Sequence, residues 1–215
     1  MSATSRPRVL IADDHILIAE ALETFLADDF DVIGIVHDGH RLIQAAANLR
    51  PDVILADIGM PLLNGLDAAE RIKRLLPDVK LIYVTVNRDP ALIAEAFRRQ
   101  ASGYLLKTAA ASELVTAINE ALQGKLYVSP SLVPSLSELT DLVEEPNSLP
   151  HKLTERQIEV LQLLAEGRSM KEAAAVLNLT ARTVAFHKYR IMHTLSLHND
   201  AEVVQYAMRK HIVFG

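Results

Sequence analysis

Hydrophobic positions in the first 124 residues alternate between short continuous runs and longer amphipathic stretches. The runs are rich in β-branched residues, which is typical of strands buried on both faces of a parallel sheet. They are Val9–Ala12, Val32–Val36, Val53–Ala56, Leu81–Val84 and Tyr104–Leu106. Helical periodicity follows them at Ile16–Leu26, His40–Leu49, Leu66–Leu76, Leu92–Gln100 and Glu113–Leu122. These five strand–helix units predict one doubly wound α/β domain over residues 1–124, with a five-stranded parallel sheet.

Residues 125–150 have a different composition. They contain four prolines, several serines and the acidic pair Glu144-Glu145. Proline and serine clusters of this kind are typical of connecting segments. We therefore predict a linker, with a short helix near Leu132–Val143.

Residues 151–215 show only helical periodicity. A helix-capping residue stands before each of the first three apolar stretches, and two of the caps are completed by a Gln or Glu three residues later. The caps are Thr154 with Gln157, Ser169 with Glu172, and Thr180. A fourth helix is expected from about Asp200 to Arg209. The sequence therefore predicts an all-α domain of four helices.

Composition and charge narrow the possible settings. The chain has no cysteine, which excludes disulfides and thiolate metal sites and fits a reducing cytosol. Its N-terminus lacks the apolar stretch of a signal peptide, and no later run approaches a membrane span. We therefore expect a cytoplasmic protein. Acidic residues outnumber basic ones in residues 1–124, and the reverse holds in residues 151–215, so we expect the two domains to have different partners.

Three carboxylates stand at the ends of predicted strands. Asp13 and Asp14 follow the first strand, and Asp57 follows the third. In a sheet of order 2-1-3-4-5 these strands flank the point where strand order reverses, beyond whose carboxyl ends ligands bind. Acids that close together repel one another unless a cation is present, and a few hard oxygen ligands favour Mg²⁺.

Two further polar residues end later strands. Thr85 follows the fourth strand and Lys107 follows the fifth. An ammonium and a hydroxyl that face a carboxylate cluster can hold a phosphoryl group. The nucleophile that accepts this group would be Asp57, as an acyl phosphate.

The spacing of these residues closely resembles that of receiver domains in two-component response regulators. The stretches that carry the resemblance are Asp57-Ile58-Gly59-Met60-Pro61, Asn64-Gly65 and Gly103-Tyr104-Leu105-Leu106-Lys107. The resemblance spans residues 8–124 and implies a flavodoxin-like fold.

The same resemblance implies a role for each site residue. Asp57 would be the phosphoacceptor and a Mg²⁺ ligand. Asp14 would bind Mg²⁺ directly, Asp13 directly or through water, and Gly59 through its backbone carbonyl. Thr85 and Tyr104 would form a switch pair, and Lys107 would bind the phosphoryl group.

Three histidines, Gly59 and Asn87 are further positions to consider near this site. His15, His37 and His40 do not form a metal-ligand spacing, and we expect them at the surface. Gly59 supplies no side chain near the phosphoryl site, and Asn87 is the nearest variable polar group. We expect both positions to bear on the phosphate lifetime.

The third predicted helix of the C-terminal domain has one apolar seam, and its other faces are basic and aromatic. A helix of this type can enter the DNA major groove while its flanks contact phosphates. The candidate DNA contacts are Lys171, Arg182, Thr183, Phe186, Lys188, Tyr189 and Arg190. His187 is on the seam and is expected to be structural.

This domain resembles the LuxR/NarL-type DNA-binding domain over about residues 151–213. The resemblance rests on Leu153-Thr154-Glu155-Arg156-Gln157, Lys171-Glu172-Ala173-Ala174, Leu179-Thr180, Thr183-Val184 and Ile191-Met192. It implies that the third helix reads DNA and that the fourth helps two subunits to dimerise. Many members have a polar residue after the Thr-Val pair, where this chain has Ala185.

The leading hypothesis is a phosphorylation-controlled transcriptional regulator. A sensor histidine kinase would phosphorylate Asp57, and a homodimer would then bind promoter DNA. One alternative is a DNA-binding regulator that uses its receiver only for dimerisation. Another is a Mg²⁺-dependent phosphotransferase of the haloacid-dehalogenase type, which is disfavoured because Ile58-Gly59 replaces the second acid expected there. We therefore do not expect an enzyme.

Overall fold

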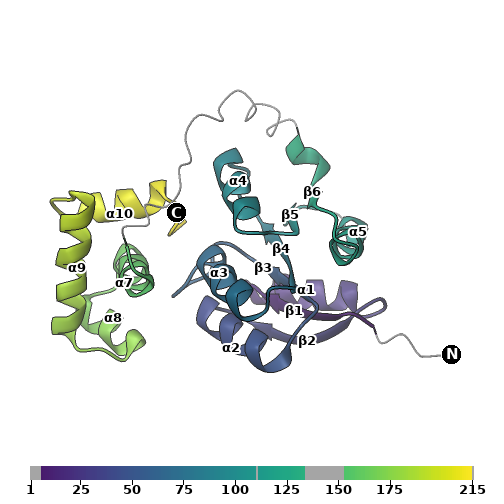
Figure 1. Cartoon of the computed structure of the whole chain (residues 1–215), viewed down its shortest axis with the longest axis horizontal. Coiled ribbons are helices and arrows are strands. Elements are labelled where there is room, and N and C mark those ends of the chain that lie inside the picture. The colour runs from purple at the N-terminus through teal and green to yellow at the C-terminus, as the bar shows by residue number, and fades with distance from the viewer. Residues whose placement is uncertain (1–5, 110, 134–152, 215) are drawn as a thin grey trace. The chain divides into compact units, whose positions relative to one another are not determined.

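The structure is a computed structural model that describes residues 6–109, 111–133 and 153–214. The chain divides into two compact units, Met1–Glu145 and Pro146–Gly215. The first unit is a parallel sheet covered by helices, and the second is helical (Figure 1). The predicted α/β and all-α architectures are both confirmed.

The sheet of the first unit has six strands in the order β2-β1-β3-β4-β5-β6, and every neighbouring pair is parallel. Its strands are β1 (Arg8–Ala12), β2 (Asp31–Val36), β3 (Val53–Ala56), β4 (Lys80–Thr85), β5 (Gly103–Leu106) and β6 (Tyr127–Val128). The order expected for the first five strands is confirmed. The reversal of strand order therefore lies between β1 and β3, whose ends carry the predicted acids.

Helices cover both faces of the sheet. They are α1 (Ile16–Leu26), α2 (Gly39–Leu49), α3 (Gly65–Leu75), α4 (Pro90–Arg98) and α5 (Ala111–Leu122). Buried residues of α1 and α5 join one hydrophobic cluster, and those of α2, α3 and α4 join the other. The strands between the two clusters are buried on both faces, which explains their continuous apolar runs.

The sixth strand is the main difference from the prediction of five strands. It lies in the segment predicted as a linker and continues into the 3₁₀ helix η1 (Pro130–Leu132). The amide of Tyr127 donates to the carbonyl of Ser102 at 3.0 Å, and the Leu132 side chain is buried in the core. A two-residue strand is too short to produce a periodic pattern, so no hydrophobic periodicity marks it in the sequence. Of the helix predicted near Leu132–Val143, residues 134–143 lie outside the described part of the chain.

The second unit contains four described helices, as predicted. They are α7 (Glu155–Ala165), α8 (Met170–Leu177), α9 (Ala181–Leu195) and α10 (Asp200–Arg209). Both predicted capping boxes are present, and the Thr180 side chain caps α9 by accepting from the amide of Thr183. Asn178 ends α8 in the left-handed conformation, with φ of 53°, which turns the chain sharply into α9. None of the helices in the described ranges is long and apolar enough to cross a membrane.

Candidate functional site

The three predicted acids converge at the carboxyl ends of β1 and β3. Asp13 and Asp57 are buried, and Asp14 is exposed. Each of these acids offers one possible metal-ligand atom, and so does His15. These four atoms all lie within 4.8 Å of one another. The amide of Asp57 donates to the carbonyl of Ala12 at 2.8 Å, which extends the β1–β3 pairing into the site. The sheet itself therefore sets the spacing of the acids.

Lys107 joins the two buried carboxylates. Its Nζ lies 2.7 Å from Asp57 Oδ2 and 2.7 Å from Asp13 Oδ2, and its side chain is only 5% exposed. Burial opposes the charge of Lys107, but the hydrogen bonds and charges of Asp13 and Asp57 outweigh it, so the pKa of Lys107 is raised. The ammonium is thus held charged beside the proposed acceptor, where it can also contact a phosphoryl group.

The predicted switch residues share a partner. The amide of Asn87 donates to Thr85 Oγ1 at 3.3 Å, and the hydroxyl of Tyr104 donates to the carbonyl of Asn87 at 3.1 Å. Thr85 and Tyr104 are both buried. Burial is the main cause that raises the pKa of Tyr104, and the negative charges of Asp89 and Asp57 raise it further. The sequence singled out Asn87 only as a variable polar position. Its backbone connects the end of β4 to the Tyr104 ring.

Gly65 allows α3 to begin directly against the backbone of Asp57 and Ile58, which we call the acceptor loop. A Cβ atom at this position would lie 2.1 Å from the carbonyl oxygen of Asp57. The amide of Gly65 donates to Ile58 at 2.9 Å, and the side chain of Asn64 caps the helix. The amide of Gly59 also donates to Asp57 Oδ1 at 3.3 Å. The Asn64-Gly65 motif therefore holds the backbone around Asp57 in place.

Of the three histidines expected at the surface, His15 is exposed, whereas His37 and His40 are half-buried. His15 is 61% exposed, yet its Nδ1 lies 3.1 Å from Asp13 and 3.0 Å from Asp14. His37 is half-buried, and its Nδ1 lies 2.8 Å from the carbonyl oxygen of Asp13. Two of the three histidines therefore contact the acids that follow β1.

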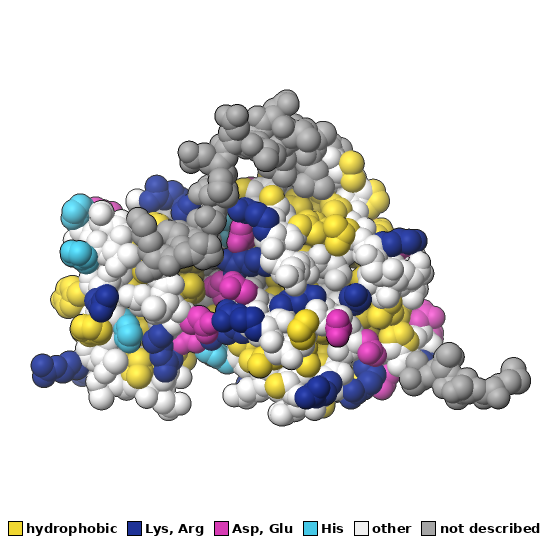
Figure 2. Space-filling view, in the orientation of Figure 1, with side chains coloured by type: hydrophobic (Ala, Val, Ile, Leu, Met, Phe, Trp, Pro, Cys, Tyr) yellow, Lys and Arg dark blue, Asp and Glu magenta, His cyan; other side chains and the backbone are white. Residues whose placement is uncertain are grey.

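The outer face of α9 carries most of the candidate DNA contacts. Arg182, Phe186, Tyr189 and Arg190 are exposed, with Phe186 at 56% and Tyr189 at 67%. The guanidinium of Arg190 lies 5.7 Å from the centre of the Phe186 ring, a cation–π distance. In Figure 2 the left edge of the view, over α9, shows hydrophobic and basic side chains beside one another. An exposed face of this kind offers both base contacts and phosphate contacts.

The other candidate DNA contacts either have partners within the domain or lie on another helix. Lys188 is 16% exposed, and its Nζ lies 2.6 Å from Oδ1 of Asp200, at the start of α10. The hydroxyl of Thr183 lies 2.9 Å from that of Thr180. Lys171 is exposed on α8. The structure therefore gives Lys188 a partner within the domain, which its position in the sequence did not indicate.

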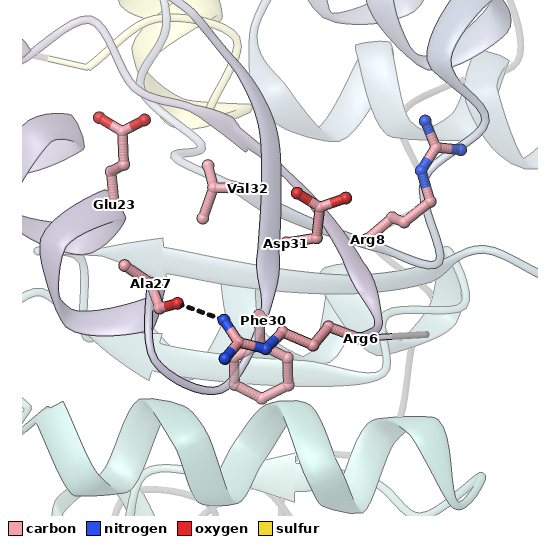
Figure 3. A pocket seen from close by; sticks show the side chains of 7 residues that line it. All are labelled: Arg6, Arg8, Glu23, Ala27, Phe30, Asp31 and Val32. Atoms are coloured by element: carbon pink, nitrogen blue, oxygen red, sulfur yellow. Dashed lines mark hydrogen bonds between the residues drawn. The ribbon is translucent and has the colours of Figure 1, made fainter. Parts of the chain in front are cut away.

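A pocket of about 520 Å³ lies at the opposite end of the sheet from the acids, and it is drawn in Figure 3. Arg6 donates to the carbonyl of Ala27 there, at 2.8 Å. Arg8 donates to the carbonyl of Leu49 at 2.6 Å, next to the end of α2. Both guanidinium groups thus serve the fold, and we assign no ligand to this pocket.

Comparison with known proteins agrees with both domains. Residues 9–119 match the family of response regulator receiver domains, and residues 151–207 match the luxR family of bacterial regulatory proteins. Response regulator GacA of Pseudomonas aeruginosa is 31% identical over 208 residues, which cover 96% of this chain and 97% of that protein. Transcriptional regulatory protein LiaR of Bacillus subtilis is 37% identical over 210 residues, which cover 96% and 99%.

Solved structures give the same result. RcsB of Salmonella enterica serovar Typhimurium, bound to promoter P1flhDC in the presence of the phosphomimetic BeF₃⁻, matches with a TM-score of 0.61 and 27% identity over 94% of this chain and 98% of that one. A structure of two RcsB dimers bound to two parallel DNAs has the same TM-score and identity. Since both families match and the relatives align along nearly the whole chain, this protein belongs to the LuxR family of two-component response regulators, which are DNA-binding transcriptional regulators rather than enzymes.

Proposed function

We propose that phosphorylation of Asp57 by a sensor histidine kinase controls how this protein binds promoter DNA. The observation that carries the proposal is the contact of Lys107 with both Asp57 and Asp13, inside a group of four possible metal ligands. A buried carboxylate beside a fixed ammonium can accept a phosphoryl group, because the added negative charge already has a partner.

The donor set fits a divalent cation. Asp13 Oδ2 is buried and touches Lys107 as an ion pair, yet among the described residues it has no hydrogen-bond donor in suitable geometry. Asp13, Asp14, Asp57 and the backbone carbonyl of Gly59 would hold Mg²⁺, which prefers a few oxygen ligands together with water and phosphate. When bound, Mg²⁺ would neutralise charge on the transferring phosphoryl group.

The chain's own residues perform the transfer. A carboxylate oxygen of Asp57 bonds to phosphorus, and the bond from phosphorus to the leaving group of the donor breaks. Lys107 holds one phosphoryl oxygen by charge. Thr85, at the end of β4, donates its hydroxyl to another, while its oxygen accepts from the amide of Asn87. Tyr104 donates to the carbonyl of Asn87, so a movement of Thr85 toward the phosphoryl group would reach β5 through this residue.

The C-terminal domain would bind double-stranded promoter DNA as a homodimer. The exposed face of α9 would enter the major groove, with Arg182 and Arg190 as the main charged contacts. Phe186 and Tyr189 would supply apolar or stacking contacts to base edges and sugars. Lys171, Thr183 and Lys188 remain candidates. For Lys188, DNA binding requires release from Asp200.

The first experiment is phosphorylation by a small donor. The wild-type protein is incubated with Mg²⁺ and acetyl phosphate, and its intact mass is measured beside Asp57→Asn. We expect the wild type to gain one phosphoryl group and Asp57→Asn to gain none, because the amide is a poor nucleophile. Omission of Mg²⁺ should abolish the gain.

Each alternative result has a distinct meaning. Equal labelling of Asp57→Asn would place the acceptor elsewhere. A folded wild type that takes up no phosphoryl group and binds no Mg²⁺ would favour the regulator that uses its receiver only for dimerisation. Mg²⁺ binding can be followed separately by calorimetry, which distinguishes a missing cation site from a need for the kinase itself.

A further inference from the structure

The chain leaves the receiver through β6 and η1, residues 127–132, which we call the interdomain segment. Ser129 lies within this segment and is 1% exposed. It follows β6 and precedes the 3₁₀ helix η1, so its side chain and amide both face β5. Its amide donates to the carbonyl of Tyr104 at 3.0 Å, and its Oγ accepts from the amide of Leu106 at 3.3 Å. One residue thus contacts β5 at the switch tyrosine and again directly before Lys107.

The same hydroxyl is tied to α5. Ser129 Oγ donates to the carboxylate of Glu113. Beyond Ser129, the Leu132 side chain is buried in the hydrophobic cluster that contains Tyr104. The bonds of Ser129 and the buried leucine thus add to the β5–β6 pairing and to the packing of Tyr127 and Val128 in attaching this segment to the receiver.

The position of Lys107 is coupled to this attachment. Its ammonium contacts Asp57, and its own amide donates to the carbonyl of Thr85 at 2.8 Å. A phosphoryl group on Asp57 would extend the acceptor outward, and a shift of the Lys107 ammonium to follow it would act on the end of β5. The bond between Ser129 and the amide of Leu106 would resist such a shift, so the docked segment would favour the unphosphorylated geometry.

We propose that Ser129 is a positioning residue that couples the phosphorylation site to the interdomain segment, and that phosphorylation of Asp57 releases β6 and η1 from β5. The proposal rests on the phosphorylation of Asp57 proposed above. By thermodynamic reciprocity, loosening the segment must favour phosphoryl binding by the same factor.

The test uses the full-length protein and BeF₃⁻, which occupies the place of a phosphoryl group on a carboxylate. Amide hydrogen exchange of Tyr127 and Ser129 is measured by NMR with Mg²⁺ alone and with Mg²⁺ and BeF₃⁻. We expect BeF₃⁻ to accelerate both amides at least about fivefold, the lower end of typical coupling between sites.

The reciprocal arm compares two buried serines. Ser129→Ala removes the bonds of the hydroxyl to the amide of Leu106 and to Glu113, whereas Ser102→Ala, directly before the start of β5, removes a similar 3.3 Å bond from the amide of Leu81. Ser129→Ala should bind BeF₃⁻ more tightly than the wild type, by about the factor seen in exchange. Ser102→Ala should bind it as the wild type does. A role of Ser129 in stability alone would lower the free energy of unfolding of Ser129→Ala without raising its affinity for BeF₃⁻.

Two results would overturn the coupling. The first is BeF₃⁻ that binds the wild type without a change in either amide, which contradicts the coupling but leaves the acceptor role of Asp57 intact. The second is an equal change of BeF₃⁻ affinity in both variants. Failure of the wild type to bind BeF₃⁻ would instead reject the phosphorylation site together with the coupling. The exchange arm uses the wild type and remains decisive if Ser129→Ala does not fold.

Discussion

At the scale of single residues, the acceptor loop depends on a position with no side chain. Gly65 places the first turn of α3 against the backbone of Asp57, and a methyl group there would overlap the carbonyl oxygen at 2.1 Å. Backbone atoms cannot rotate away from such a contact as a flexible side chain can. The loop would have to move, and it carries the proposed nucleophile.

Gly65→Ala should therefore destabilise the protein and slow phosphorylation together. We expect a loss of about 1–3 kcal/mol in the free energy of unfolding, as for other overpacked sites. Gly34→Ala is the matched control, because a Cβ there would meet side chains at 3.4 and 3.5 Å, an ordinary contact distance. Urea denaturation and the rate of acetyl phosphate uptake measure the two effects. A Gly65→Ala variant as stable as Gly34→Ala would contradict this account of the loop.

The sequence predicted the site residues whose positions follow from the ends of strands. It missed the contacts that depend on how two side chains pair. Asp13, Asp14, Asp57 and Lys107 each follow a recognisable strand, so the topology alone brings them together. The contacts of His15 with the acids depend on rotamers and loop geometry, which leave no periodic signal. The pairing of Lys188 with Asp200 likewise joins two helices whose packing angle is not readable from the chain.

At the scale of elements, α9 shows which parts of a helix can be predicted. Its cap, its apolar seam and its exposed basic face follow from spacing, and Val184 and Ile191 are buried as the pattern requires. The short strand β6 has only two residues, and a following proline marks the segment as irregular. Its place beside β5 is therefore a property of the tertiary fold.

Arg182→Ala and Arg190→Ala should weaken DNA binding. Each is expected to reduce the slope of log affinity against log salt by about 0.9 if it removes one phosphate contact. Loss of a base contact would instead alter sequence preference at one position. The matched control is Arg209→Ala, which removes an exposed arginine from α10. Fluorescence anisotropy with duplex DNA selected from a random library measures both quantities. Equal effects of all three variants would remove α9 from its proposed role.

At the scale of the whole molecule, two compact units share one chain, and the proposed signal must pass from an acidic site to a basic helix. Relatives that align along nearly the whole chain keep both units together. The family membership explains why the sequence predicted the overall function so well. The motifs of each domain are dense and lie at fixed spacings. The coupling proposed at Ser129 lies in a segment whose sequence pattern is weak.

Phosphorylation should raise the affinity of the full-length protein for its DNA. We expect acetyl phosphate with Mg²⁺ to strengthen binding by about 5- to 150-fold, the usual range of coupling between two sites. The affinity of Asp57→Asn should not respond to the same treatment. The measurement is anisotropy at fixed salt, with dimerisation followed by analytical ultracentrifugation. If Asp57→Asn bound DNA as tightly as the phosphorylated wild type, the two domains would not be coupled through this site.

The ion pair between Lys188 and Asp200 has a consequence for how such a regulator can evolve. In the proposed DNA complex the exposed side of α9 would face the bases, whereas Lys188 is paired with Asp200 of another helix. A substitution at position 200 would then change the strength of DNA binding while the surface proposed to read the bases stays the same. Affinity and sequence preference can then drift separately, so that a lineage adjusts the occupancy of all its promoters at once without exchanging one set of target genes for another.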